Sequence, residues 1–171
     1  MTDAKLRPPL DAETKVAETD HKAEVRLWLR LLTCTTLIET EVRKRLRAEY
    51  GETLPRFDLM AQLDRVGDGM TLGEVSRRMM VSAANVTSLV ERLVSVGYLE
   101  RRAAPNDRRS QLIRLTAAGR AHFGRMAASH RAWVAELLAD LKARDISAAM
   151  DELAKVKQSV SRAIDLAERG K

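Results

Sequence analysis

Residues 70–116 read MTLGEVSRRMMVSAANVTSLVERLVSVGYLERRAAPNDRRSQLIRLT, and this stretch decides the fold. Thr71 and Glu74 have the spacing of a capping box, which predicts a helix over residues 72–80. A serine at the start, apolar residues at helical spacing and a glycine at the end predict a second helix over residues 82–96. Two helices joined by so short a turn are typical of a helix-turn-helix.

A hairpin is predicted directly after these helices. Residues 98–102 and 110–116 are short strand candidates, and the segment between them, AAPNDRR, has the turn chemistry of Pro105, Asn106 and Asp107. Helix, turn, helix and hairpin in this order are the layout of a winged helix-turn-helix. The predicted fold is therefore mainly α with a small β wing.

Long helices are predicted on both sides of this unit. Apolar residues recur every three or four positions over residues 21–50, and similar patterns predict helices over residues 55–66, 116–141 and 145–167. The predicted organisation is a flexible tail over 1–20, a winged helix-turn-helix over 55–116, and a helical dimerisation region over 21–54 and 117–168.

Composition excludes several classes of protein. The chain has 171 residues, 45% of them hydrophobic, with a net charge of +6. No apolar run approaches the roughly 18 residues of a membrane helix, and the first twenty residues lack the apolar centre of a signal peptide. One cysteine allows no internal disulfide and suits the reducing cytoplasm. The basic balance favours anionic partners.

The outer face of the second helix is predicted to read base edges in the major groove. With Val86 placed inward, small polar residues and an arginine fall on or beside the opposite side, and Ser82 caps a helix start that can meet a phosphate. The predicted DNA-binding residues of this helix are Ser82, Ala84, Asn85, Thr87, Ser88 and Arg92.

The hairpin is predicted to supply cations for the minor groove. Between Arg77 and Arg114 there are eight arginines and three acids, a net +5 in 38 residues, so the rest of the chain nets only +1. The arginines on or beside the hairpin loop are Arg101, Arg102, Arg108 and Arg109. Asp107 is placed either to pair with Arg109 and stiffen the turn or to support the wing.

The segments TLGEVSRRM, VSAANVTSLVERLVSVGYLERR and NDRRSQLIRLTAAGR resemble the MarR family of bacterial transcription regulators. The resemblance extends over most of residues 22–165. It implies that Ser82–Arg92 is the recognition helix, that Arg108 and Arg109 are wing contacts, and that Asp107 orients the wing. Ala83 and Ala84 stand where the family usually has polar or basic residues.

A homodimer on a palindromic DNA site is predicted. A helix of 30 residues is about 45 Å long, longer than a small domain is wide, so part of its apolar stripe needs a partner. Two copies place two recognition helices on two half-sites. The resemblance agrees with a dimer.

The resemblance also implies a small effector, often aromatic or carboxylated, that weakens DNA binding. An aromatic acid or its thioester suits a pocket of aromatic faces and a cation. The candidate lining residues are Trp28, Arg30, Arg56, Phe57, His130 and Trp133. A role for the two tryptophans in the core or dimer, and a surface position for the histidine, are the alternatives.

The predicted function is a sequence-specific DNA-binding regulator, a repressor released by its effector, with neither cofactor nor metal. One alternative is a redox-responsive regulator acting through Cys34, although its place on the apolar stripe predicts a buried, unreactive thiol. Others are an architectural DNA-binding protein without sequence preference, and a winged helix used for protein contacts. No motif of an enzyme occurs, and three histidines and one cysteine form no recognisable metal site.

Overall fold

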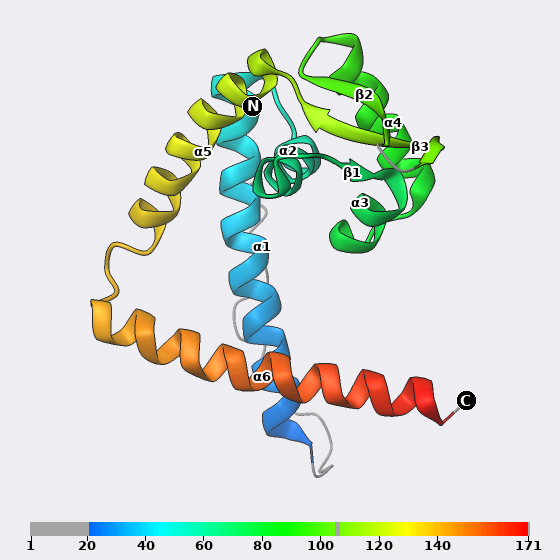
Figure 1. Cartoon of the computed structure of the whole chain (residues 1–171). Helices are drawn as coiled ribbons and strands as arrows, with labels where there is room; N and C mark the ends of the chain where they lie inside the picture. Colours follow the sequence, from blue (N-terminus) through cyan, green and yellow to red (C-terminus); the bar gives the residue numbers. More distant parts are fainter. Residues whose placement is uncertain (1–20, 105–106, 171) are drawn as a thin grey trace, which may run out of the picture. The chain divides into compact units, whose positions relative to one another are not determined.

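A computed structural model describes residues 21–104 and 107–170, and for residues 104 and 107–110 it describes the backbone alone. The tail predicted over residues 1–20 lies outside this range. The chain divides into two compact units, residues 1–131 and 132–171, which are described separately. The fold is mainly helical with one small three-stranded sheet (Figure 1).

The first unit begins with the long helix α1, Lys22–Tyr50, which ends at Gly51 in a left-handed conformation (φ +65°). Helix α2, Leu54–Val66, follows with proline in its first turn. Both agree with the sequence patterns.

The helix-turn-helix consists of α3, Leu72–Met79, and α4, Ala83–Ser95. The predicted capping box at the start of α3 is confirmed: the Thr71 hydroxyl accepts from the Glu74 N–H, and the Glu74 carboxylate accepts from the Thr71 N–H. Val75 of α3 and the inner face of α4 are buried in the core of this unit. The fully buried large side chains of the unit are Leu46, Leu59, Met60, Leu63, Val75, Val86, Val90, Leu93, Ile113 and Met126.

The hairpin differs from its predicted form. Strands β2, Leu99–Ala104, and β3, Asp107–Leu115, are longer than predicted, and β3 also pairs with β1, Met70–Thr71, in the order β1-β3-β2. Ala103 pairs with Gln111 but Ala104 pairs with Asp107, so residues 108–110 form an irregularity within β3. The prediction that residues 107–109 belong to a loop was therefore wrong, because pairing resumes beyond the irregularity.

Helix α5, Ala117–Leu137, ends four residues before the predicted end, and its last residues belong to the second unit. The second unit continues with α6, Ala143–Arg169, which contains no buried residue. Among the described residues, no helix combines the length and apolar character needed to cross a membrane.

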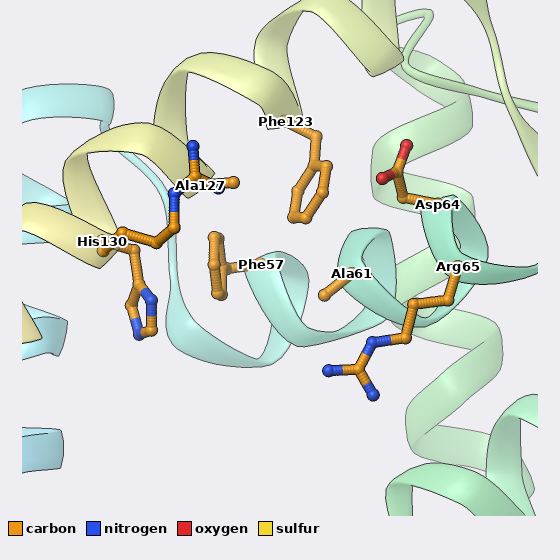
Figure 2. A pocket seen from close by; sticks show the side chains of 8 residues that line it. Phe57, Ala61, Asp64, Arg65, Phe123, Ala127 and His130 are labelled. Carbon is orange, nitrogen blue, oxygen red and sulfur yellow. The ribbon is translucent and has the colours of Figure 1, made fainter.

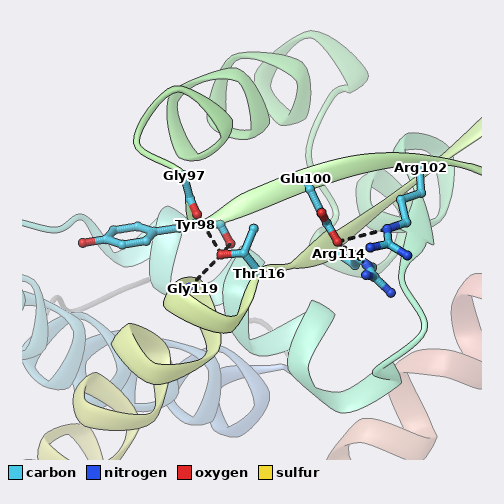
Figure 3. Close-up of polar contacts among 7 residues, drawn as sticks. All are labelled: Gly97, Tyr98, Glu100, Arg102, Arg114, Thr116 and Gly119. Atoms are coloured by element: carbon cyan, nitrogen blue, oxygen red, sulfur yellow. Dashed lines mark hydrogen bonds and ion pairs between the residues drawn. The ribbon is translucent and has the colours of Figure 1, made fainter.

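A polar junction joins the end of α4 to the start of α5 (Figure 3). The Thr116 hydroxyl donates to the Gly97 carbonyl at 2.7 Å and accepts from the Gly119 N–H at 3.0 Å. The Thr116 N–H donates to the Tyr98 carbonyl at 3.0 Å, and the Tyr98 N–H donates to the Leu93 carbonyl at 2.9 Å. One threonine therefore caps α5 and binds the segment that leaves α4.

A second cluster surrounds His122, one turn further along α5. The His122 ring stacks on Tyr98 (centroids 4.4 Å apart) and meets the edge of Tyr50. Its Nε2 is buried, makes no hydrogen bond among the described residues, and lies 3.7 Å from a Glu52 carboxylate oxygen. Burial lowers the pKa of His122, Glu52 opposes that shift, and Arg125 adds to it.

We predict that Gly119→Ala unfolds this junction. A β-carbon at Gly119 would lie 2.0 Å from the Tyr98 carbonyl oxygen, a backbone atom that cannot move aside as a flexible side chain could. The expected loss of stability is about 3 kcal/mol or more, at or beyond the upper end for overpacking, measured by urea unfolding. Gly124→Ala on the same helix is the control, because its β-carbon would meet nothing within 4 Å. It should stabilise by roughly 0.5–1 kcal/mol, and equal effects of the two changes would contradict the contact.

We predict that acid weakens the fold through His122. Because the folded pKa is below the ordinary value of 6.5, the unfolded chain takes up the proton first. Stability is therefore lost as the pH falls through 6.5 and below. Urea unfolding between pH 7.5 and 5 measures the slope.

His122→Phe keeps the stacking on Tyr98 and removes the titration, so its slope should be shallower. His130→Phe is the comparison, because the pKa of His130 is lowered as well. Burial is the larger cause of that shift, and the charge of Arg131 is the smaller one. A slope unchanged by His122→Phe would refute this assignment.

Candidate nucleic-acid interface

Helix α4 separates an apolar inner face from a small polar outer face. Val86, Val90 and Leu93 are buried. The Ser82 hydroxyl accepts from the Asn85 N–H at 3.4 Å, so it caps the helix. The exposed residues along α4 and at its cap are Ser82, Ala83, Ala84, Asn85, Ser88, Glu91, Arg92 and Ser95.

The structure places five of the six predicted recognition residues of this helix on its exposed side. The exception is Thr87, which is half-buried and donates its hydroxyl to the Ala83 carbonyl at 2.9 Å. That donor is occupied within the helix, so Thr87 offers a ligand mainly an acceptor oxygen and a methyl group. The side chains best placed to reach base edges are those of Asn85, Ser88 and Arg92.

The described part of the hairpin carries an ion-paired network at its base (Figure 3). Glu100 of β2 pairs with Arg114 of β3 and, at 3.1 Å, with Arg102. The Arg114 hydrogen bond is the main cause that lowers the pKa of Glu100. Arg101 and Arg102 are both exposed on this strand.

The predicted wing contacts Arg108 and Arg109, and the predicted support Asp107, lie at the start of β3. Their side chains lie outside the described residues. Their backbone nevertheless has a defined place, because Asp107 pairs with Ala104 and the ladder resumes at Gln111. The two arginines therefore belong to the irregular stretch next to the hairpin tip.

A separate pocket lies in the first unit between α2 and α5 (Figure 2). Its volume is about 270 Å³. The centroid of the Phe57 ring lies 5.5 Å from that of the Phe123 ring and 4.9 Å from that of the His130 ring. The lining residues are Phe57, Ala61, Asp64, Arg65, Phe123, Ala127, His130 and Arg131.

The structure brings together only two of the six predicted effector residues, Phe57 and His130. Trp28 and Arg30 are exposed on α1, with Trp28 60% exposed. Arg56 pairs with Glu52 at 3.0 Å, and Trp133 is buried and belongs to the second unit rather than to the first. The charges that line the pocket come instead from Asp64, Arg65 and Arg131. No sequence pattern indicated these, because Arg65 and Arg131 resemble ordinary surface arginines.

Cys34 is exposed on α1, so the prediction of a buried thiol was wrong for this chain. The apolar stripe that it was assigned to remains largely uncovered in the first half of α1, where Leu27, Leu29 and Leu32 are about half exposed. Within the described ranges, no group of three or more metal-ligating side chains occurs.

Comparisons with known proteins agree with this architecture. The MarR family model matches residues 50–110. The chain is 30% identical over 164 residues to the transcriptional activatory protein BadR of Rhodopseudomonas palustris, covering 90% of this chain and 92% of BadR. A crystal structure of a MarR family transcriptional regulator from Silicibacter pomeroyi is 32% identical, with a TM-score of 0.71, covering 84% of this chain and 99% of that one.

The fold is also shared with a mutant of MarR from E. coli, whose crystal structure was solved in complex with operator DNA. That chain is 23% identical with a TM-score of 0.69, and the match covers 81% of this chain and 99% of that one. These relatives are transcription regulators and not enzymes. The chain belongs to the MarR family of transcription regulators.

Proposed function

We propose that this regulator binds a palindromic operator as a homodimer, with α4 in the major groove and the hairpin over the adjacent minor groove. The observation that carries the proposal is the exposed outer face of α4, which has only small side chains over its first two turns, with Asn85 and Ser88 as its polar groups. Small residues let a helix enter the groove deeply, and an amide such as that of Asn85 can bond an adenine edge in two places. The operator complex of the E. coli protein, which has the same fold, supports this docking.

The hairpin supports the same proposal through charge. Contacts from arginine to phosphate give affinity without sequence preference, whereas side chains on α4 discriminate bases. Arg101 is exposed, and Arg108 and Arg109 stand close to the tip. We assign the DNA contacts of the wing to Arg108 and Arg109, with Asp107 as their support. We assign the reading of bases to α4.

Two uncovered apolar surfaces support a dimer. In the first unit, the beginning of α1 exposes Val25, Leu27, Trp28, Leu29 and Leu32. In the second unit, α6 exposes a row of apolar side chains spaced three, four or seven residues apart: Ile146, Met150, Leu153, Val160 and Ile164. Rows at this spacing are typical of helices that pack on other helices. A second copy is the partner that a palindromic site requires.

The pocket of the first unit suits the aromatic acid of the proposed effector. Phe57 and Phe123 offer ring faces, and Arg65 and Arg131 can bind a carboxylate, which arginine recognises with paired hydrogen bonds. A volume of about 270 Å³ admits a single-ring acid whole. A bulky thioester would enter by its acyl end only.

We propose repression as the outcome when the operator overlaps a promoter, because a bound dimer then excludes polymerase. BadR is named an activatory protein, whereas a MarR structure with the same fold is named a multiple antibiotic resistance repressor. Proteins of this fold thus include an activator and a repressor by name. In our proposal, the position of the operator relative to the promoter decides which effect a bound dimer has.

We predict that bases and phosphates are read by different residues. On a duplex selected from a random library by the wild-type protein, Asn85→Ala should lose about 1–3 kcal/mol at particular base pairs. Binding to random duplexes should not change. Arg108→Ala with Arg109→Ala should weaken both kinds of duplex and reduce the slope of log K against log salt by about 2.

Arg162→Ala, a cation of α6, is the control and should leave both properties as they are. Fluorescence anisotropy at several salt concentrations measures them. A library that yields no preferred sequence would refute the operator and favour an architectural role.

We predict that benzoate or phenylacetate raises the melting temperature of the protein, since a ligand that binds the folded state stabilises it by mass action. Either acid should also weaken binding to the selected duplex. Arg131→Gln should reduce the affinity for the acid about tenfold or more, the value of one charge-assisted pair of roughly 1.5–3 kcal/mol.

Arg47→Gln, an exposed arginine of α1 that does not line the pocket, is the matched control. Equal loss in the two variants would place the acid elsewhere.

A further inference from the structure

Met80 stands in the turn between α3 and α4 with 92% of its surface exposed. No other large apolar residue in the described part of the chain is as exposed. A long apolar side chain held in water in this way contributes little to the core. The exposed Met80 side chain therefore favours a role in binding over a role in the core.

The backbone of Met80 is also unusual. Its φ of +53° and ψ of +38° are left-handed, and it is the one non-glycine residue with positive φ among those described. Glycine or asparagine usually takes this position at the end of a helix, because a β-carbon is strained there. The presence of methionine is therefore unfavourable for the turn itself.

Hydrogen bonds on both sides hold the turn in place. The Val81 N–H donates to the Ser76 carbonyl at 3.2 Å, and the Ser76 hydroxyl donates to the Val81 carbonyl at 2.6 Å. The Met80 N–H donates to the Arg77 carbonyl at 3.4 Å. The backbone beneath the thioether is thus fixed, and its side chain starts from a defined position.

Met80 lies in the turn that leads directly into α4, the proposed recognition helix. It stands two residues before Ser82, which caps α4. In the major groove, the apolar feature that a base pair presents is the C5 methyl group of thymine. A flexible, polarisable thioether can fit such a group at more than one angle.

We propose that Met80 is a specificity-determining residue that contacts the C5 methyl group of a thymine in each operator half-site. This inference rests on the proposed function, since it requires α4 to enter the major groove. It adds a base preference from a residue outside the recognition helix.

The test removes the methyl group from the DNA and the thioether from the protein. The probe is the duplex selected by the full-length wild-type protein, with each thymine replaced in turn by deoxyuridine. At one position per half-site, wild type should bind roughly fourfold more weakly, the value of one buried methyl group. Met80→Asn should show no such penalty there, and Met80→Leu should keep it.

Met80→Asn suits the left-handed turn, so its melting temperature should be no lower than that of wild type. Val96→Asn is the matched control: Val96 is 58% exposed just beyond the other end of α4 and should keep the wild-type pattern.

A selected duplex that shows no deoxyuridine penalty, or the same penalty in wild type and Met80→Asn, would overturn the inference and leave operator binding intact. A loss in Met80→Asn that is equal for thymine and deoxyuridine would indicate a backbone or protein contact and would also overturn it. Failure to select any sequence would refute the operator itself, and the inference with it.

Discussion

The approach of the first turn of α5 to the Tyr98 carbonyl is the constraint on which the DNA-binding unit depends. A β-carbon at position 119 cannot fit there, so glycine is required by space and not by backbone angle. Thr116 stabilises the same contact, because its hydroxyl donates to the Gly97 carbonyl and its N–H donates to the Tyr98 carbonyl. The orientation of α4 relative to α5 is therefore set by backbone atoms within one short segment.

Two neighbouring residues of α5 contact different parts of the first unit. His122 lies against Tyr98 and Glu52, whereas Phe123 lies against Phe57 in the pocket. The residue that touches the exit of α4 and the residue that lines the pocket are thus consecutive on one rigid helix. Under the proposed function, a ligand that moves Phe123 away from Phe57 acts on the turn of α5 that also contacts Tyr98, the residue that follows the end of α4.

Local patterns predicted the helices and several of their ends because the signals are local. The capping box of α3, the Ser82 cap and Gly51 each act within four residues, and each has its expected geometry. The irregularity in β3 was missed because it depends on the register of β3 against β2, which the pattern within one strand does not fix. The pocket was only partly predicted for the same reason. Phe57 and Arg131 are far apart in sequence, and aromatic residues such as Trp28 and Trp133 provided a stronger but less relevant signal.

The number of arginines in a segment is not the number that the folded protein leaves unpaired. The segment from Arg77 to Arg114 carries eight arginines, but Glu100 holds Arg102 and Arg114 at the base of the hairpin. An arginine engaged in this way must exchange or share its carboxylate before it contributes fully at a phosphate. The arginines elsewhere in the segment, such as Arg92 and Arg101, are exposed. The network holds the two strands together at the base of the hairpin, so Arg102 and Arg114 are already paired there within the protein.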